Sequence, residues 1–265
     1  MKRKIFCLAV ALCLIFSLLT GFTACTKPSD NSSSSAQGGG SSSGGQELPD
    51  NTAASKDHSK ILYYSENNVA YDDGNDCYEY CFMTPYLAAR PTGGAVLVFP
   101  GGAYSNLSNS RLADGKKTGT DNDGDQKESS SIAKFYNAQG ISVFIVNYRT
   151  KSVVGTAISY KQILPAPARA LKTVRKNADK YYVKKDKIAV QGYSAGGHLA
   201  SVMVTKGCFD IADPTYVKDE IDEEKAVVSA GVLCYPVITL AESYTHKTTA
   251  KNFSGGDSAI KTEYS

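Results

Sequence analysis

Apolar runs alternate with amphipathic stretches through the second half of the chain. Short apolar runs bounded by glycine, proline or polar residues are typical of buried strands. Four such runs lie at residues 96–99, 141–147, 188–191 and 227–233. Strands that alternate with helices form a largely parallel sheet, so the pattern predicts the α/β class, with helices flanking the sheet.

Between the strand candidates, apolar side chains recur at intervals of three and four residues, which indicates helices with one buried face. These positions are Ile132, Phe135 and Tyr136 in one stretch, and Leu164, Ala168, Leu171, Val174 and Ala178 in another. Pro165 and Pro167 fit only the first turn of the second helix. Nearer the N-terminus, Tyr63 and residues 77–83 are expected to form an antiparallel edge of the sheet.

A serine between two glycines follows the third apolar run. Gly192, Ser194 and Gly196 come after residues 187–191 and lead into a stretch rich in small and apolar residues. A strand, sharp turn and helix in this order form a nucleophile elbow, in which a side chain on either glycine would collide with the crowded backbone. The turn holds the serine hydroxyl out at the top of the sheet. Ser194 is therefore the candidate nucleophile.

Backbone amides that could bind an oxyanion are expected beside this serine. An acyl-transfer enzyme of this type uses one N–H from the residue after the nucleophile and another from the loop after the third strand. Ala195 fits the first role. Gly102 and Ala103 fit the second, because the strand at 96–99 runs directly into this loop and glycine lets the chain turn its amides inward.

Taken in order along the chain, these and other segments resemble the α/β-hydrolase esterases of the acetyl-xylan-esterase and hormone-sensitive-lipase-like kind. The matching segments are residues 84–87, 99–104, 133–135, 140–141, 147–149, 168–170, 174–178, 192–200, 235–238 and 246–252, with Gly255. Pro100 stands where many relatives carry the histidine of a His-Gly-Gly-Gly loop, and Ala103 replaces a glycine. The resemblance implies an α/β-hydrolase fold, hydrolysis of short acyl esters such as acetyl groups on plant cell-wall polysaccharide, and no cofactor.

The resemblance also implies where the catalytic partners of Ser194 should lie. In this family the triad follows the chain order serine, aspartate, histidine, with the acid after the seventh strand and the histidine after the eighth. The apolar runs take the places of strands three to six, and two further strands with their helices need about 50 to 70 residues. The sequence is therefore expected to be a C-terminally truncated domain that lacks the last strands, the triad acid and the triad histidine.

None of the three histidines is expected to replace the missing base. His58 precedes the domain and should be solvated. His198 lies one turn after Ser194 on the same helix, so its ring should pack against the sheet instead of reaching the serine oxygen. His246 falls in a stretch that resembles a family segment not used as the base. Without a base the hydroxyl is a poor nucleophile, and the chain alone is expected to be nearly inert.

The N-terminal residues indicate export and lipid attachment. Basic residues at 2–4 precede an apolar stretch at 5–19, and small residues end it, as in a secretory signal peptide. Cys25 stands at what resembles a bacterial lipoprotein cleavage site, where the cysteine is lipidated and becomes the new N-terminus. Residues 1–24 are thus expected to be the signal peptide. An uncleaved anchor is the alternative, because the apolar run is a little short of the ~20 residues that span a bilayer.

A serine- and glycine-rich stretch follows the signal and contains almost no apolar residues. Residues 25–58 are therefore expected to form a flexible tether, and residues 59–265 the incomplete α/β-hydrolase domain. A tether of about 30 residues has a root-mean-square reach on the order of 30 Å. The domain is expected at the extracellular face of the cell membrane, held by its lipid or secreted, where it could contact bulky polysaccharide.

The charge of the domain argues against a nucleic-acid partner. The formal net charge of +3 at pH 7 comes from the basic residues at 2–4, and without them 26 basic residues stand against 26 acidic ones. No basic field remains for nucleic acid, and the membrane is reached only through the lipid anchor. The acidic run at 219–224 is expected to be a solvated face. The aspartate-rich segment at 121–125 lacks the spacing of a calcium loop, so no metal site is expected.

The cysteines of the domain show no metal-site spacing. Cys77 and Cys81 lie four apart on an expected strand, which separates their side chains by about 13 Å and disfavours a disulfide. A pair between Cys208 and Cys234 is conceivable, because disulfides persist outside the cytoplasm.

Three functions agree with these features. The first is a carboxylesterase whose partner is a small ester or an acylated polysaccharide. The second is a serine peptidase of the prolyl-oligopeptidase type, against which the loop at 100–104 and the absence of a propeller-like repeat argue. The third is a non-catalytic surface protein, favoured by the missing acid and base. The residues carry no signal of an oligomeric state.

Overall fold

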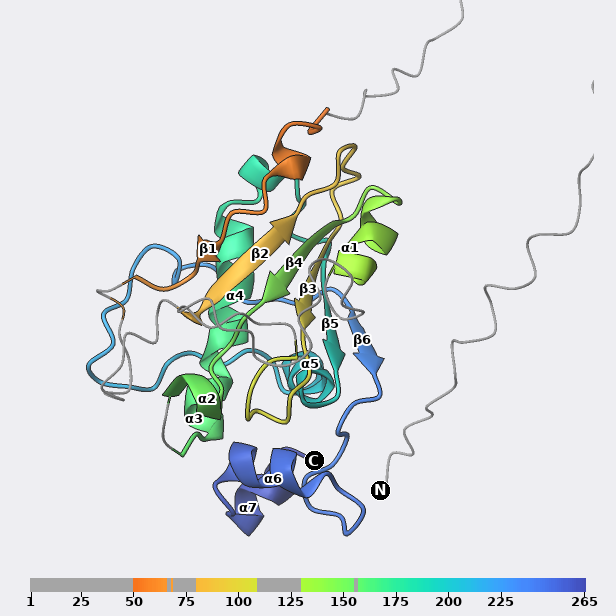
Figure 1. Ribbon diagram of the computed structural model, residues 1–265. Coiled ribbons are helices and arrows are strands. Elements are labelled where there is room, and N and C mark those ends of the chain that lie inside the picture. Colours follow the sequence, from red (N-terminus) through yellow and green to blue (C-terminus); the bar gives the residue numbers. More distant parts are fainter. Residues whose placement is uncertain (1–49, 66–67, 69–79, 109–129, 155–156) are drawn as a thin grey trace, which may run out of the picture. The chain divides into compact units, whose positions relative to one another are not determined.

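The computed structural model describes residues 50–65, 68, 80–108, 130–154 and 157–265 (Figure 1). The chain divides into two compact units, Met1–Gly45 and Gln46–Ser265, and all described residues belong to the second. The expected signal peptide, Cys25 and the segment at 121–125 lie outside the described residues. Among the helices that the structure describes, none combines the length and the apolar character needed to cross a membrane.

A sheet with the strand order β1-β2-β4-β3-β5-β6 forms the centre of the second unit (Figure 1). Its parallel strands are β3 (Ala95–Phe99), β4 (Ser142–Val146), β5 (Ile188–Tyr193) and β6 (Gly231–Cys234). At one edge, β2 (Phe82–Tyr86) pairs antiparallel with β4, and β1 (Ile61–Leu62) pairs antiparallel with β2. The predicted α/β class with a mostly parallel sheet is confirmed.

The ends of two strands differ from the prediction. β6 begins at Gly231, because residues 227–230 approach β5 through isolated hydrogen bonds, such as that from Ser229 N to Ile188 O at 2.8 Å, and not as a regular ladder. β2 begins at Phe82, later than expected, and residues 77–79 lie outside the described part of the chain.

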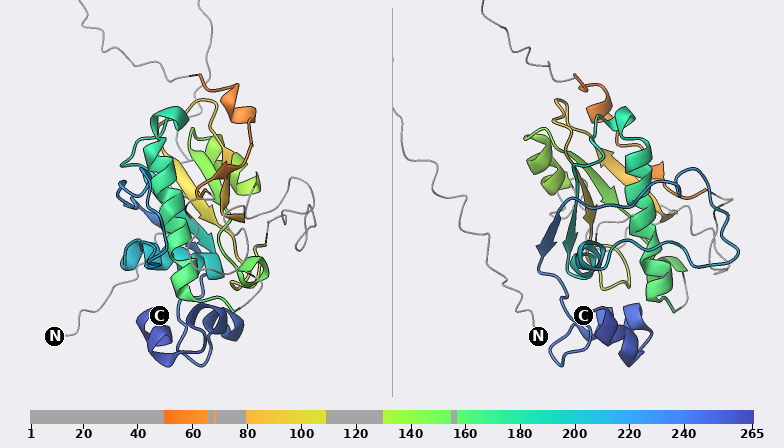
Figure 2. Two further views of the ribbon diagram at one scale, coloured as in Figure 1. Left: turned by 90° about the vertical axis from the view of Figure 1, so that its left-hand side faces the viewer. Right: turned by 180° about the vertical axis from the view of Figure 1, so that it is seen from behind.

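Helices cover both faces of the sheet (Figure 2). α1 (Ser130–Asn137) packs on one face, whereas α4 (Pro165–Lys176) and α5 (Ala195–Thr205) pack on the other. α4 begins at a proline, as the prolines at 165 and 167 predicted. On α1, Ile132 and Tyr136 pack against the sheet as expected, but Phe135 is 59% exposed because it lies on the outer side of the helix.

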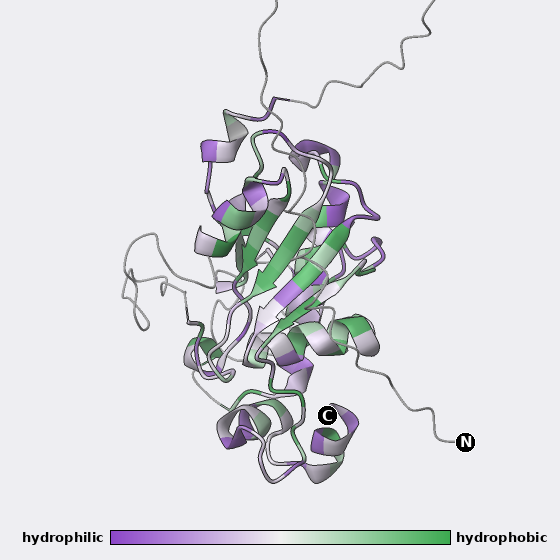
Figure 3. Ribbon diagram, turned by 90° about the vertical axis from the view of Figure 1, so that its right-hand side faces the viewer, coloured by the Kyte–Doolittle hydropathy of each residue, from purple (hydrophilic) through white to green (hydrophobic). Residues whose placement is uncertain are grey.

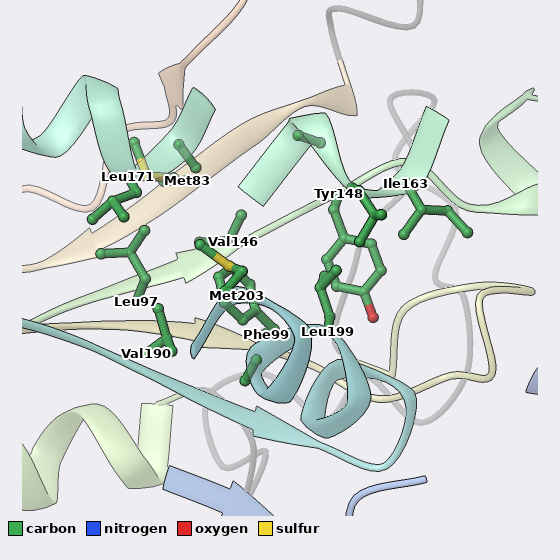
Figure 4. Packing of buried hydrophobic residues seen from close by; sticks show 14 of the residues in the cluster. Met83, Leu97, Phe99, Val146, Tyr148, Ile163, Leu171, Val190, Leu199 and Met203 are labelled. Atoms are coloured by element: carbon green, nitrogen blue, oxygen red, sulfur yellow. The ribbon is translucent and has the colours of Figure 1, made fainter. Parts of the chain in front are cut away.

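Alternate residues of β3 point to opposite faces of the sheet. Val96 and Val98 belong to the cluster under α1, whereas Leu97 and Phe99 belong to the larger cluster under α4 and α5. Figure 4 shows this larger core, where Leu199 of α5 is directed toward the sheet. Because both faces are covered, every residue of β3 is buried and the strand is hydrophobic along its length (Figure 3).

Two short helices lie beyond the carboxyl ends of the parallel strands in both views (Figures 1 and 2). They are α6 (Lys247–Ser254) and α7 (Ser258–Glu263). His246 caps α6, and Asp257 caps α7 by accepting hydrogen bonds from two amides of its first turn. Further short helices are η2 (Ala54–Lys56), α2 (Lys151–Val154), α3 (Tyr160–Ile163) and η5 (Asp179–Tyr181). Ligands of open parallel sheets bind at this carboxyl end.

The acidic run at 219–224 is only in part the solvated face that the sequence suggested, because Glu220 and Glu223 are exposed whereas Asp219 and Asp222 pair with α4. The guanidinium of Arg169 is buried, and its Nη2 and Nη1 atoms lie 2.5 Å from Asp219 Oδ2 and 2.7 Å from Asp222 Oδ2. Burial acts to lower the pKa of Arg169, but the hydrogen bonds to Asp219 and Asp222 outweigh it and raise the pKa. The run therefore pairs with α4, because a buried guanidinium needs carboxylates close to it.

The cysteine pair considered from the sequence does not form. Cys208 and Cys234 are thiols, and no disulfide joins them. Cys208 follows α5 and Cys234 ends β6. Burial raises the pKa of Cys208 to about 11, so this thiol stays protonated near neutral pH.

Candidate active site

The turn between β5 and α5 depends on two glycines. A Cβ atom on Gly192 would lie 2.0 Å from the carbonyl oxygen of Gly196. A Cβ on Gly196 would lie 2.1 Å from Phe99 O and 2.5 Å from Pro100 O. The first turn of α5 is therefore pressed against the end of β3, which brings the serine turn next to the loop that follows β3. This crowding is the one expected from the spacing of the glycines.

Ser194 has a backbone conformation that residues other than glycine rarely adopt. Its φ is 52° and its ψ is −115°, at the junction of β5 and α5. Hydrogen bonds hold both sides of this residue: Ser194 N donates to Cys234 O at 3.1 Å, and Val237 N donates to Ser194 O at 3.1 Å. Strain of this kind persists only where the surroundings over-determine it, and it is common at active sites.

The Ser194 side chain is partly exposed at the N-terminus of α5. Its hydroxyl does not cap the helix, and within the described residues it has no hydrogen-bond partner. The N-terminal end of α5 carries the positive end of the helix dipole, which favours negative charge beside Ser194. The group is therefore placed to meet a ligand. Its catalytic role stays a prediction.

The predicted oxyanion donors lie on the two sides of this crowded junction. Ala195 is the first residue of α5, where an amide has no intrahelical acceptor. Gly102 and Ala103 have φ values of 130° and 57° in the loop after β3. Among the described residues, none accepts a hydrogen bond from these three amides. Their assignment as oxyanion donors stays a prediction.

His198 is buried and does not bind the nucleophile. Its Nδ1 lies 2.8 Å from the Tyr104 hydroxyl, and its Nε2 lies 2.8 Å from Tyr264 O. Burial lowers the pKa of His198 to about 4. The sequence correctly indicated that the ring does not bind the serine oxygen. The ring is held by Tyr104, Phe253 and Tyr264, none of which lies in a strand.

The other two histidines also have partners away from Ser194. His246 Nδ1 lies 2.8 Å from Thr249 Oγ1, where it caps α6. His58 is exposed, as expected, and its Nδ1 lies 2.8 Å from Pro85 O at the antiparallel edge. Within the described residues, no histidine forms a hydrogen bond with the Ser194 hydroxyl.

Three residues that the sequence did not single out hold the loop after β3. Tyr104 contacts α5 through its hydroxyl, which lies 2.9 Å from Ala195 O. Tyr148 donates its hydroxyl to Pro100 O at 2.6 Å. Asn252 of α6 donates to Ala103 O at 2.9 Å. All three stand in segments that carry the resemblance, but nothing in their spacing indicated that they meet at one loop.

Comparisons with known proteins find relatives of this chain. The BD-FAE family model matches residues 117–262. An acetylxylan esterase of Xylanibacter ruminicola is 29% identical over 173 residues, which cover 65% of this chain and 28% of that protein. Endo-1,4-beta-xylanase B of Butyrivibrio fibrisolvens is 33% identical over 128 residues, which cover 47% of this chain and 18% of that protein. The chain thus spans less than a third of the length of either curated relative.

A solved structure has a similar fold. The acetyl ester-xyloside bifunctional hydrolase from Caldicellulosiruptor lactoaceticus superposes with a TM-score of 0.58 at 28% sequence identity. The superposition covers 76% of this chain and 64% of that one. This likeness and the sheet order together establish an α/β-hydrolase fold.

Proposed function

Since this chain belongs to the BD-FAE family, we propose that it is a serine carboxylesterase that hydrolyses short acyl esters, with Ser194 as the nucleophile. One observation carries the proposal. Ser194 occupies a left-handed turn at the N-terminus of α5, and the amides of Ala195 and of Gly102 and Ala103 in the loop after β3 have no acceptor among the described residues. Acyl transfer needs an accessible nucleophile and amide donors for the oxyanion, and these features support the proposal.

In the proposed reaction, Ser194 Oγ forms a bond to the ester carbonyl carbon and gives up its proton to water, since the described residues supply no base there. The carbonyl π electrons move onto oxygen, and the amides of Ala195 and the loop stabilise the oxyanion. Collapse of this intermediate breaks the bond to the alcohol, which leaves with a proton, and an acyl-serine remains. Water then attacks the acyl group in the same way and releases the acid and the free serine.

We also propose that the first step, the attack of Ser194 on the ester, is slow. Within the described part of the chain, no histidine or carboxylate is hydrogen-bonded to the Ser194 hydroxyl. A serine without a base keeps only the contribution of binding and of the oxyanion hole, which is about 10³- to 10⁴-fold over water in serine proteases. We therefore expect weak turnover that still depends on Ser194.

We propose acetyl groups on xylan as the substrate. The support comes from two relatives, which are called an acetylxylan esterase and an acetyl ester-xyloside hydrolase.

We also propose that a lipid on Cys25 places the domain at the extracellular face of the membrane. The support is that basic residues, an apolar stretch and small residues follow one another in residues 1–24. Replacing Cys25 with serine should abolish incorporation of a labelled fatty acid into the expressed protein, and unchanged incorporation would contradict the anchor.

A fluorophosphonate probe tests the nucleophile directly, because it forms a covalent bond with a serine hydroxyl at an oxyanion site and leaves a mass increment. Because no base is described beside Ser194, the chain should be labelled slowly at Ser194, over a long incubation, and the Ser194→Ala variant should stay unlabelled. Ser258→Ala, which alters an exposed serine at the start of α7, is the matched control and should be labelled like the wild type. Absence of labelling at Ser194 would contradict the esterase and favour a non-catalytic surface protein.

Turnover assays separate the reaction classes. Hydrolysis of p-nitrophenyl acetate should be slow in the wild type and lost in Ser194→Ala. Release of acetate from acetylated xylan should follow the same pattern. Cleavage of a prolyl peptide anilide, but not of the acetate ester, would replace the esterase by a peptidase. A kcat in the ordinary enzymatic range of about 1–10³ s⁻¹ would contradict the slow first step.

A further inference from the structure

Tyr104 links the loop after β3 to the helix that carries Ser194. Its side chain is fully buried. Its hydroxyl lies 2.9 Å from Ala195 O and 2.8 Å from His198 Nδ1. Because Tyr104 directly follows Ala103, a single residue connects the two expected sources of oxyanion donors.

The loop needs such a link, because its backbone is strained. Gly102, Ala103 and Tyr104 are consecutive residues with φ values of 130°, 57° and 57°. Two of them carry side chains, for which this left-handed region is unfavourable. A backbone of this kind keeps its shape only while the surrounding contacts hold it. The direction of the Ala103 amide therefore depends on what holds Tyr104.

His198 extends the link to the C-terminal helices. Its Nε2 lies 2.8 Å from the carbonyl oxygen of Tyr264, the residue that ends α7. The ring also packs edge-on against Phe253 of α6, with 4.8 Å between the ring centroids. Tyr264 O can only accept a hydrogen bond, so the ring proton belongs on Nε2. Nδ1 then accepts from Tyr104, whose single proton is shared with Ala195 O.

We propose that Tyr104 and His198 are positioning residues that set the spacing between the Ala103 and Ala195 amides, and that Tyr264 holds them in place. This inference rests on the proposed esterase function of the same site. Neither residue touches the reacting atoms. The α6–α7 segment thereby acts on the oxyanion hole through one chain of hydrogen bonds, from Tyr264 through His198 to Tyr104.

The first test removes one hydroxyl. Tyr104→Phe keeps the ring but loses both contacts, and Tyr136→Phe is the matched control, since its hydroxyl bonds Gln191 Oε1 at 2.6 Å on the other face of the sheet. We expect Tyr104→Phe to shift the amide NMR resonances of Ala103 and Ala195 and to slow phosphonylation of Ser194 roughly ten- to a hundredfold. Tyr136→Phe should do neither.

The second test removes the two hydrogen bonds of His198 one at a time. An asparagine at 198 offers an amide near the position of Nδ1, and a glutamine offers one near Nε2. His198→Asn therefore keeps the contact with Tyr104 and loses that with Tyr264, whereas His198→Gln does the reverse. Because the link needs both contacts, each variant should slow phosphonylation about tenfold. These variants also carry the test if Tyr104→Phe fails to fold.

A spectroscopic measurement distinguishes a positioning role of Tyr104 from a general contribution to stability. In the wild type, the imidazole ¹⁵N resonances should report a neutral ring protonated at Nε2, with Nδ1 accepting a hydrogen bond. In Tyr104→Phe the Nδ1 resonance should move toward that of a free acceptor. Tyr136→Phe should leave it in place.

Two outcomes would overturn the positioning role: Ala103 and Ala195 amide resonances in Tyr104→Phe that match the wild type, or wild-type phosphonylation rates in both His198 variants. The NMR readouts do not depend on turnover. A wild-type chain that is not phosphonylated would overturn the proposed esterase, and the amide resonances would then decide the positioning role alone.

Discussion

The side-chain amide of Asn252 donates a hydrogen bond to the carbonyl oxygen of Ala103 at 2.9 Å, across 149 positions of sequence. The same amide donates to Ser105 Oγ at 2.8 Å. α6 thus holds the loop after β3 from outside, while Tyr104 holds it from within. A strained loop with two independent supports can present its amides in a fixed direction, which is what an oxyanion site requires.

Replacing Asn252 with alanine removes the outer support. We expect Asn252→Ala to slow phosphonylation of Ser194 about tenfold and to lower the free energy of unfolding by about 1 kcal/mol. Asn177→Ala is the matched control, because that amide bonds Thr173 O at the end of α4. It should lower stability by a similar amount and leave the labelling rate unchanged. Equal labelling rates in the two variants would contradict a role of Asn252 in supporting the loop after β3.

The Arg169 ion pairs should matter far more to stability than the exposed pair between Lys176 and Glu220 on the same helix. Arg169 is 3% exposed and faces Asp219 and Asp222, so Arg169→Ala leaves two carboxylates without their cation. We expect a loss of about 3–5 kcal/mol in the free energy of unfolding, measured by urea denaturation. Lys176→Ala breaks the exposed pair with Glu220 and should leave the free energy of unfolding nearly unchanged, because solvent screens such a pair. Similar losses in both variants would contradict this account.

His198 should make the fold sensitive to mild acid. Burial lowers its pKa from 6.5 to about 4. Between these values the unfolded chain binds a proton that the folded chain does not, so stability is full above pH 6.5 and falls as the pH drops toward 4. The loss should reach roughly 3 kcal/mol. Urea titrations should show this slope in the wild type and in His58→Gln, whose ring is exposed, but not in His198→Gln.

Gly196 should tolerate no side chain. An added Cβ would lie 2.1 Å from Phe99 O, a backbone atom of a central strand that has no room to move. We expect Gly196→Ala to destabilise the protein by at least about 3 kcal/mol. Gly94→Ala is the matched control, because its added Cβ would lie 3.4 Å from the Ile141 side chain, which is close to ordinary contact. The midpoint temperature of thermal unfolding should fall much further in Gly196→Ala than in Gly94→Ala.

Much of this fold and part of its site follow from local order along the chain. The apolar runs identified the parallel strands. For β3 and β4 the reason is that a strand covered on both faces is apolar throughout. Gly192, Ser194 and Gly196 identified the turn by their spacing. The crowding at Gly192 comes from Gly196, four residues away, although the crowding at Gly196 comes from Phe99 and Pro100 at the end of β3. Both signals reside in neighbouring residues, so they can be recognised without knowing where distant segments lie.

Other features exist only because the chain folds back on itself. The acidic run resembled a solvated surface, yet Asp219 lies against Arg169, 50 positions away. His198 was expected to face the sheet, but Tyr264 and Tyr104 take both of its nitrogens. A hydrogen bond or an ion pair between distant residues depends on the path of every segment between them, and no spacing rule encodes that path. Local sequence therefore settled the parallel strands, the helices that flank them and the serine turn, whereas long-range packing alone determined what holds the loop after β3.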